Sequence, residues 1–347
     1  MLIYDMVNSQ QLQGYVRGLH LELDANQFTL SGILPNRNIT DIEFRITQGT
    51  LLDQDVATVR AWDTPVGIAG RQGLTRLMGE LPPLGRKIRL GEEERIRLNQ
   101  LLRNGTAANG GYAEAINSIY NDVGNMARAV AARMEMFRGE ALSSAAIAIN
   151  ENGVKLDIDF GRDASLDTAP ATAWTDTAGS TPLDDELAWL QTYYDFNYQS
   201  PTAVVTSLTV VRLLQRNEQY RTLATFNGLT PSYLSLEQIN QVRAAYTLPP
   251  IIIYNTKVRV NGVATRIIPE YDFIYIPSPG PLGSTLLGVT AEAIELASAN
   301  EITQDQLPGM TAVIMKESEP VATWTKVSAV GVPILANPNL TMRIDVG

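Results

Sequence analysis

A long helical pattern that leads directly into a tight β-hairpin constrains the fold of this chain more than any other sequence feature. Apolar residues recur every three or four positions from Tyr112 to Phe137, which places them on one face of an α-helix. The pattern continues to about Ser144, and at about 1.5 Å per residue the predicted helix is roughly 45 Å long. A helix of this length spans a small domain, so it suits a strut better than one side of a compact core.

The hairpin is predicted from two apolar runs, 145–149 and 155–160, that flank Asn152-Gly153. Asn-Gly between alternating apolar runs is the strongest short-range hairpin signal. Asp157 and Asp159 share one face of the second strand because they lie two residues apart. No second cluster of acids or bases accompanies this carboxylate pair, so we expect its face to meet solvent or an interface.

The scarcity of reactive side chains narrows the function. The chain of 347 residues has no cysteine and one histidine, His20. This excludes disulfides, thiol nucleophiles and cysteine metal sites, and it disfavours zinc and histidine-based acid–base chemistry. His20 lies in the alternating segment 19–23, which we interpret as an ordinary strand. We expect no cofactor and no metal site.

The formal charge of −10 and the absence of a basic patch argue against a free nucleic-acid binder. Arginine strongly outnumbers lysine among the basic residues. That bias fits protein interfaces, where arginine is enriched, and it equally fits a GC-rich genome. No apolar run reaches the ~20 residues of a membrane helix, and no signal-peptide pattern is present, so we expect a protein that folds in a cytoplasm.

The first 90 residues contain few helical signals. Residues 1–38 are polar and glycine-containing, which predicts an extended arm. Residues 39–89 alternate in two stretches, 41–47 and 56–62, and then become glycine-rich, which predicts a long two-stranded excursion with a mobile tip. Such a ribbon is marginal alone and needs a partner surface. A short helix is predicted from Gly91 to about Asn104.

The remainder of the chain alternates between strand and helix patterns. Residues 163–182 have the composition of a linker. The segment 183–305 then predicts a compact α/β unit, with a capping box at Ser235 and Gln238. Its expected elements are a buried strand at 203–206, helices at 208–214 and 235–243, a central strand at 250–254, an Asn-Gly hairpin at 257–267, a strand at 273–276 and a Pro/Gly-rich flexible loop at 277–288. Strand patterns return at 312–315, 333–336 and 340–346.

This order of elements resembles the HK97-fold major capsid proteins of tailed bacteriophages, and most closely the lambda-type family. Two stretches carry the likeness. One runs from Glu140-Ala-Leu through the Asn152-Gly153 hairpin to Asp159-Phe-Gly-Arg162, and the other is Val332-Pro-Ile-Leu-Ala-Asn-Pro-Asn-Leu340. The motifs are short, but their spacing agrees with that architecture over the whole chain.

The resemblance implies an α+β fold with named parts. Residues 1–38 would be the N-arm and 39–89 the E-loop. Residues 90–182 would be the P-domain, with its spine helix at about 112–144. Residues 183–305 would be the A-domain, and 306–347 would return to the P-domain as strands beneath the spine helix.

The resemblance also implies a function. The chain would be a non-enzymatic major capsid protein that assembles into pentamers and hexamers, forming an icosahedral head around double-stranded DNA without sequence-specific binding. Further partners would be a trimeric cement protein, a separate scaffolding protein and the portal. The protein would be a virion component assembled in the host cytoplasm. One chain that tiles a closed shell needs heterologous contacts through different patches of its surface.

Candidate intersubunit contacts are chosen because arginine and aromatic side chains dominate interface energetics. In a monomer, the same residues would be ordinary exposed side chains. The candidates are Trp62, Arg71, Arg76 and Arg86 in the excursion, Arg128 and Arg133 on the polar face of the predicted helix, and Arg162 after the hairpin.

Three motifs resemble parts of enzyme active sites, but the other sequence motifs of those enzymes are missing or a simpler interpretation is favoured. Asp159-Phe160-Gly161 matches a kinase triplet, but the other kinase motifs are missing. The glycine-rich segments at 67–73 and 280–288 lack a dinucleotide fingerprint and a phosphate-binding lysine. Residues 184–186 could form half of a cation site, although a solvated helix start is the favoured interpretation.

Two other functions compete with the phage capsid. An encapsulin-like compartment shell shares the fold but usually has a shorter chain and a cargo groove. A carboxylate-based α/β enzyme would leave the long helix unexplained and lacks a convergent acid–base set.

The shell is predicted to be non-covalent. Some HK97-fold shells are locked by lysine–asparagine isopeptide bonds from the E-loop, but the lysine that residues 39–89 contain is Lys87, at the base of the excursion. Assembled protein should therefore run as a single monomer band on a denaturing gel. A ladder of multiples would contradict this prediction.

Overall fold

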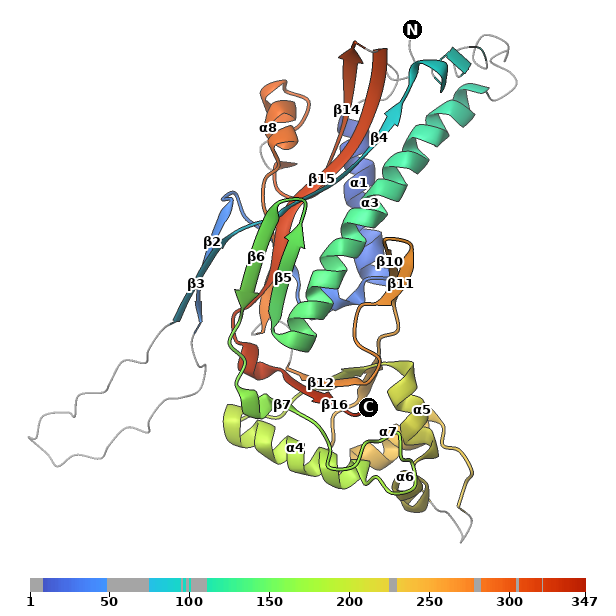
Figure 1. The fold of residues 1–347 in the computed structure, drawn as a ribbon, viewed down its shortest axis with the longest axis vertical. Coiled ribbons are helices and arrows are strands. Elements are labelled where there is room, and N and C mark those ends of the chain that lie inside the picture. The colour runs from blue at the N-terminus through green and yellow to red at the C-terminus, as the bar shows by residue number, and fades with distance from the viewer. Residues whose placement is uncertain are drawn as a thin grey trace, which may run out of the picture.

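The computed structural model describes residues 9–48, 75–94, 96–97, 100, 111–224, 230–277, 282–303, 306–319 and 321–347. These residues form an elongated upper part, built on a long helix and a long sheet, and a lower part of helices beneath a second sheet (Figure 1). The longer helices are α1 (Ser9–Asn26), α3 (Gly111–Ser144), α4 (Pro182–Asn197), α5 (Leu208–Arg216), α6 (Glu218–Leu223), α7 (Leu236–Ala245) and α8 (Ala291–Ser298). Short 3-10 helices are η2 (Thr29–Gly32), η4 (Ala164–Leu166) and η6 (Pro338–Leu340).

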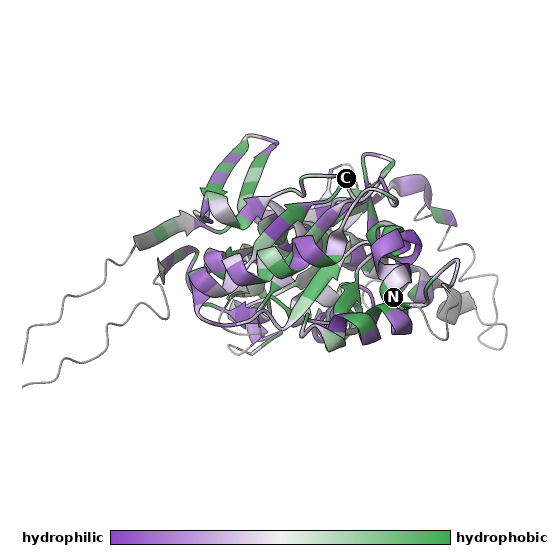
Figure 2. Cartoon of the chain, turned by 90° about the horizontal axis from the view of Figure 1, so that it is seen from below, coloured by the Kyte–Doolittle hydropathy of each residue, from purple (hydrophilic) through white to green (hydrophobic). Residues whose placement is uncertain are grey.

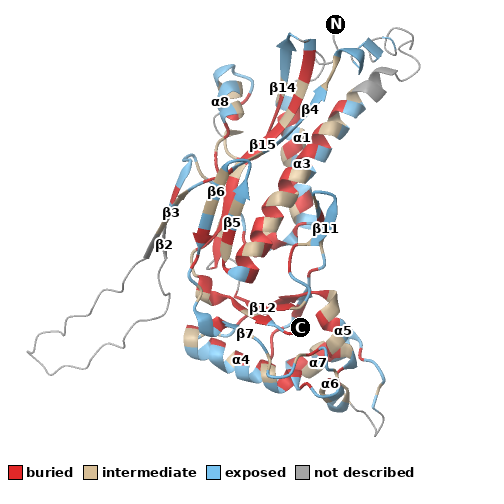
Figure 3. Ribbon diagram, viewed as in Figure 1, coloured by how far each residue is buried: buried red, intermediate tan, exposed pale blue. Residues whose placement is uncertain are grey.

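The predicted strut is the helix α3, and its bounds agree with the sequence pattern. Its apolar face is buried because every third or fourth side chain points the same way: Ile119, Val123, Met126, Val130, Met134 and Phe137. Figure 3 shows this buried stripe facing the long sheet, while exposed residues of the helix lie mainly in its upper half.

The long sheet of the upper part is organised around β15 (Val321–Leu335). Its first half pairs antiparallel with both β14 (Thr311–Ser318) and β4 (Pro83–Leu90). Its second half pairs with β13 (Gly283–Leu287), which in turn pairs in parallel with β1 (Asn36–Asn38). The strand order β1-β13-β15-β14 therefore joins segments from both ends of the chain.

The second sheet has the order β7-β16-β12-β8-β9. Its strands are β7 (Asp167–Thr168), β16 (Met342–Asp345), β12 (Asp272–Ile276), β8 (Ala203–Thr206) and β9 (Ile251–Ile253). One face covers a core with the helices α4 to α7, and the other face joins the core beneath α3 through Ala203, Val205, Ile274 and Ile276. Seen from below, hydrophobic strands lie between helices whose outer faces are largely hydrophilic (Figure 2). The α+β class is thus confirmed.

Both Asn-Gly hairpins are confirmed. The first pairs β5 (Ala146–Glu151) with β6 (Val154–Asp159), and the second pairs β10 (Lys257–Val260) with β11 (Val263–Arg266). In each turn the asparagine and the glycine have positive φ, 51° and 85° in the first and 50° and 85° in the second. Consecutive positive φ angles define the turn whose twist matches paired strands, and Asn-Gly is the pair that adopts it most readily.

The expectation of an extended arm at residues 1–38 is wrong over most of its length, because α1 occupies Ser9–Asn26. Its buried face, Leu12, Val16, His20 and Leu23, has helical spacing, but two glycines and many polar residues weaken the local signal. His20 therefore lies in a helix and not in the predicted strand. Packing of α1 between α3 and β14 supplies the stability that the local sequence does not.

Two segments expected to be a linker and a loop each contribute a strand to a sheet. Residues 163–182 contain η4, β7 and the buried Trp174, whose Nε1 donates to Asp185 at 3.0 Å. The Pro/Gly-rich segment 277–288 contains β13, while residues 278–281 lie outside the described part of the chain. Composition misled in both cases because pairing with distant strands decided the structure.

The placement of two further strands differs from expectation. The segment predicted as a central strand at 250–254 forms β9, which is at the edge of the second sheet. The last strand, β16, pairs with β12 in that sheet and does not lie with β14 and β15 beneath α3. The capping box of Ser235 and Gln238 at the start of α7 is confirmed.

The predicted ribbon is present as β2 (Glu43–Gln48) paired with β3 (Thr75–Glu80), and Figure 1 shows it projecting from the body of the molecule. The second alternating stretch, 56–62, lies outside the described residues. Residues 92–94 and 96–97 are helical, as expected after Gly91, and the predicted end of that helix near Asn104 again lies outside the described residues.

The close approach of α3 to the segment after β11 predicts a strong size limit at Gly139. A Cβ atom there would lie 2.6 Å from the backbone oxygen of Ile267. Gly139→Ala should therefore lower the free energy of unfolding by about 2 kcal/mol, measured by urea denaturation. The matched control is Gly14→Ala in α1, where nothing lies within 4 Å, and it should stabilise the protein by about 0.5–1 kcal/mol. Equal effects of the two substitutions would contradict this reading.

Candidate assembly surfaces

The projecting ribbon is anchored at its base by two apolar side chains, Phe44 and Leu81, that belong to the buried core beneath α3. Phe44 of β2 is buried, and its ring lies 2.7 Å from the position that a Cβ atom would take at Gly79 on β3. Leu81, just after β3, is also buried. In contrast, Ile42 and Met78 are 60% and 66% exposed. The ribbon is therefore fixed to the body at its root while it presents apolar side chains outward.

The candidate contacts of the excursion are only partly described. Arg76 lies on β3 opposite Thr47, which places it within the paired part of the ribbon. Trp62 and Arg71 lie outside the described residues. Arg86 lies on β4 and is exposed.

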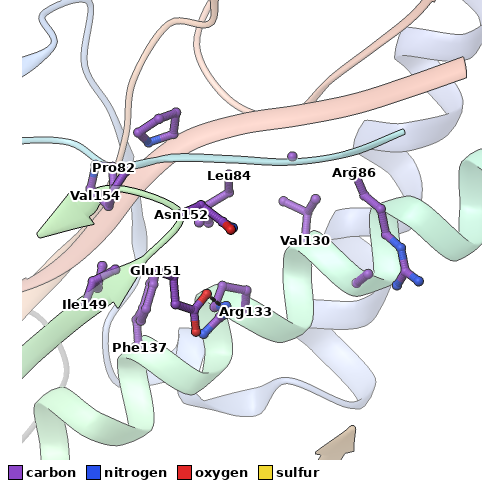
Figure 4. A pocket seen from close by; sticks show the side chains of 13 residues that line it. Pro82, Leu84, Arg86, Val130, Arg133, Phe137, Ile149, Glu151, Asn152 and Val154 are labelled. Carbon is purple, nitrogen blue, oxygen red and sulfur yellow. Dashed lines mark hydrogen bonds and ion pairs between the residues drawn. The ribbon is translucent and has the colours of Figure 1, made fainter. Parts of the chain in front are cut away.

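Two of the candidate arginines line one groove. It lies between β4, α3 and the β5–β6 hairpin and has a volume of about 280 Å³ (Figure 4). Arg86 contributes from β4 and Arg133 from α3. Arg133 donates to Glu151 at 2.6 Å and has its guanidinium 5.8 Å from the centre of the Phe137 ring. The groove thus combines apolar lining residues with the Arg133–Glu151 ion pair and the exposed Arg86 guanidinium.

The other two candidates have different surroundings. Arg128 is exposed on α3 and donates to Asn125 at 3.1 Å. The side chain of Arg162 is only 3% exposed, and it donates to the carbonyls of Leu142 and Ser143, at 3.1 and 2.6 Å, and to Asp167 at 3.1 Å. A cation at these carbonyls satisfies the end of α3 and complements its dipole. The ion pair of Arg162 with Asp167 lies inside the subunit.

A buried charge cluster holds the N-terminal segment against the strut. Arg138 on α3 donates to Asp24 at 3.1 Å, to Glu135 at 2.8 Å, to Thr285 at 3.0 Å and to Asn36 at 2.5 Å. These partners belong to α1, α3, β13 and β1. We call this set the Arg138 cluster.

Glu135 extends the cluster toward the second sheet. Its second oxygen accepts from the Tyr254 hydroxyl at 2.7 Å and from the Leu30 amide at 2.9 Å. Burial raises the pKa of the Glu135 carboxyl, and the Arg138 guanidinium opposes this rise. Burial also lowers the pKa of His20, whose Nε2 lies 3.6 Å from Asp24. Arg138 and Glu135 thus pair with each other on α3 and each also depends on partners from other elements.

The lower part has an equivalent buried pair. Glu186 on α4 accepts from Arg243 on α7 at 2.5 Å and from the Tyr220 hydroxyl at 2.7 Å. Arg243 also donates to the Pro249 carbonyl at 2.8 Å. Burial raises the pKa of the Glu186 carboxyl, and Arg243 opposes the shift. Glu186 is therefore committed to the core and is not free to bind a cation with Asp184 and Asp185.

The described residues offer no catalytic arrangement at the motifs considered above. Asp159 accepts from the Gly161 amide at 2.8 Å, which is a local turn contact. Within the described ranges, no three His, Cys, Asp or Glu side chains gather closely enough to hold a metal ion. None of the helices in the described part of the chain combines the length and apolar character needed to cross a membrane.

Comparison with solved structures identifies proteins with a similar architecture. A protein assigned to the capsid of a prophage of Escherichia coli CFT073 superposes with a TM-score of 0.63 at 13% identity, over 98% of this chain and 99% of that one. A phage-related protein of Bordetella bronchiseptica RB50 superposes with a TM-score of 0.55 at 14% identity, over 98% and 97% of the two chains. The chain has the HK97-like capsid fold. No protein-family model and no curated protein matches the sequence.

The Arg138 cluster was missed by the analysis of local sequence patterns. Asp24, Glu135 and Arg138 were not among the predicted functional residues. A signal for them existed, because Glu135 and Arg138 lie three apart on a helix, adjacent to its apolar stripe. Their partners come from residues more than 100 positions away, so the sequence could not name them.

The Arg138 cluster predicts a large loss of stability when its cation is removed. Arg138→Met leaves the buried Glu135 carboxylate without its cation, which should cost about 3–5 kcal/mol of unfolding free energy. Arg128→Met, an exposed position on the same helix, should change it by no more than about 0.5 kcal/mol. Urea denaturation measures both, and a small effect at Arg138 would show that the cluster is not needed for the fold.

Proposed function

We propose that this protein is a major capsid protein of a tailed bacteriophage, a shell subunit that assembles with its own copies around double-stranded DNA. The observation that supports this most strongly is the likeness of fold over 98% of the chain to a protein assigned to a prophage capsid. A fold shared over the full length of both chains includes the strut, both sheets and the ribbon together.

The parts of the fold have roles that follow from this proposal. Residues 1–38 are the N-arm, 39–89 the E-loop, 90–182 and 306–347 the P-domain with α3 as its spine, and 183–305 the A-domain. The structure modifies this division at both ends, because the N-arm contains α1 and the last strand, β16, joins the sheet of the A-domain. Segments near both ends of the chain, α1 and β16, therefore pack into the body of the subunit.

The proposed shell contacts are the exposed members of the candidate set. Arg86 on β4 and Arg128 on α3 present guanidinium groups at the surface, and Arg133 lines the groove beside Arg86. We extend the proposal to Trp62, Arg71 and Arg76 of the E-loop. Arg162 contributes indirectly, because it stabilises the end of the spine helix.

The proposal includes partners beyond the subunit itself. A shell of this kind needs a portal and a separate scaffolding protein during assembly, and a trimeric cement protein can stabilise it. The protein is a structural virion component, is assembled in the host cytoplasm and has no enzymatic activity. Its charge of −10 suits a shell that does not adhere to the DNA it encloses.

Electron microscopy and analytical ultracentrifugation of the purified protein test this function. Capsomer rings or closed polyhedral shells are expected, and a monomer that persists at high concentration would contradict the proposal. Shells that hold a protein cargo and no DNA when produced with the phage genes would instead indicate an encapsulin-like compartment.

Charge reversal in the groove tests the proposed contact. Arg86→Glu should raise the protein concentration needed for assembly by about tenfold or more, since an interface arginine that becomes a carboxylate loses its partner and repels it. Arg37→Glu is the matched control, because Arg37 is an exposed arginine on β1 outside the groove. If the two variants assemble alike, the groove is not a shell contact.

A further inference from the structure

The two Asn-Gly hairpins carry opposite charges on their outer faces. Both hairpins place one apolar face against the core beneath α3, through Ile147 and Ile158 in the first and Val258 in the second. Because side chains alternate along a strand, the residues between the buried ones form the outer face of each hairpin. These two outer faces are not explained by the contacts proposed above.

The outer face of the β5–β6 hairpin carries two acidic side chains beside small ones. Asp157 and Asp159 are exposed on β6. Directly opposite them on β5 are Ala148 and Ala146. Small neighbours leave both carboxylates accessible to long side chains from another molecule. Lys155 lies on the same face, nearer the turn.

The outer face of the β10–β11 hairpin is basic. Lys257 and Arg259 are exposed on β10, and Arg266 lies directly opposite Lys257. Like charges in directly opposite positions destabilise a hairpin, so an acidic partner would relieve this face. Glu270 is the acidic neighbour of this face, and it is engaged by Arg266 at 3.1 Å and by Thr209 at 2.7 Å.

These charges are only partly neutralised within the subunit, because Lys257 interacts electrostatically with Glu270 but forms no ion pair with it. Among the residues that the structure describes, the ion pairs include none of Asp157, Asp159, Lys257 and Arg259. Figure 1 shows the two hairpins on either side of α3, with the helix between them. The acidic face of one copy can therefore meet the basic face only of another copy.

The spacing of the charges is complementary. Asp157 and Asp159 are two residues apart on one strand, and so are Lys257 and Arg259, which separates the members of each pair by about 6.5–7 Å. Two salt bridges can then form side by side. The two patches differ, so each copy would use one face toward each neighbour, which builds a ring or an open chain and not a two-fold dimer.

We propose that the β5–β6 hairpin of one subunit docks its Asp157 and Asp159 against Lys257 and Arg259 on the β10–β11 hairpin of the next. This inference rests on the proposed shell function, and it identifies the two surfaces through which copies of the chain meet. The partner is a second copy of this chain.

Charge reversal and charge exchange test the contact. The variant with Asp157→Lys and Asp159→Lys should need at least about tenfold more protein for assembly, and so should the variant with Lys257→Glu and Arg259→Glu, since like charges then face each other. Their combination in one chain should restore assembly. All four positions are exposed, so thermal melting should show that each variant is still folded. Assembly that is indifferent to both reversals would overturn the proposal.

Cross-linking provides a second readout, because the chain has no native cysteine. A chain with Asp157→Cys and Arg259→Cys, treated with a short bis-maleimide, should give a ladder of covalent multimers, while the chain with Asp157→Cys and Arg37→Cys should not. Equal ladders from both would overturn the docking. Wild-type protein that forms neither rings nor shells would contradict the proposed function, whereas wild-type shells that tolerate both reversals would refute this contact alone.

Discussion

The structure depends on the packing of one helix, α3, against one strand, β15. The apolar stripe of α3 is buried along the length of the sheet that β15 organises, and strands from three other parts of the chain pair with β15. A helix of 34 residues cannot be stable alone on propensity, so this burial supplies its stability. The ribbon, the hairpins and the second sheet are all positioned relative to this one contact.

Buried polar groups determine how the other elements attach to this frame. The Arg138 cluster connects α1, β1, β13 and the segment after β9 to one side of the strut, and Arg162 closes its end. Apolar packing tolerates small shifts in position, whereas a buried guanidinium with several fixed partners does not. We infer that the cluster defines the position of the N-terminal segment, while the hydrophobic core provides most of the free energy.

This division leaves the outer faces available for assembly. Charged and apolar side chains that are not needed inside the subunit occur on the ribbon, in the groove beside β4 and on the two hairpins. A thin tile has a large surface for its volume, so several separate patches can each contact a different neighbour. The proposed contacts in the groove and at the two hairpins both use side chains of this exposed set.

Local signals in the sequence by themselves determined α3, the two Asn-Gly turns and the capped start of α7 at Ser235, because those elements depend on neighbours within a few residues. Only the tertiary structure decided that residues 283–287 form a strand, that residues 9–26 form a helix, and that Glu135 and Arg138 make a cluster. Their partners lie far along the chain, and the local spacing of residues in one segment does not identify a distant segment that packs against it.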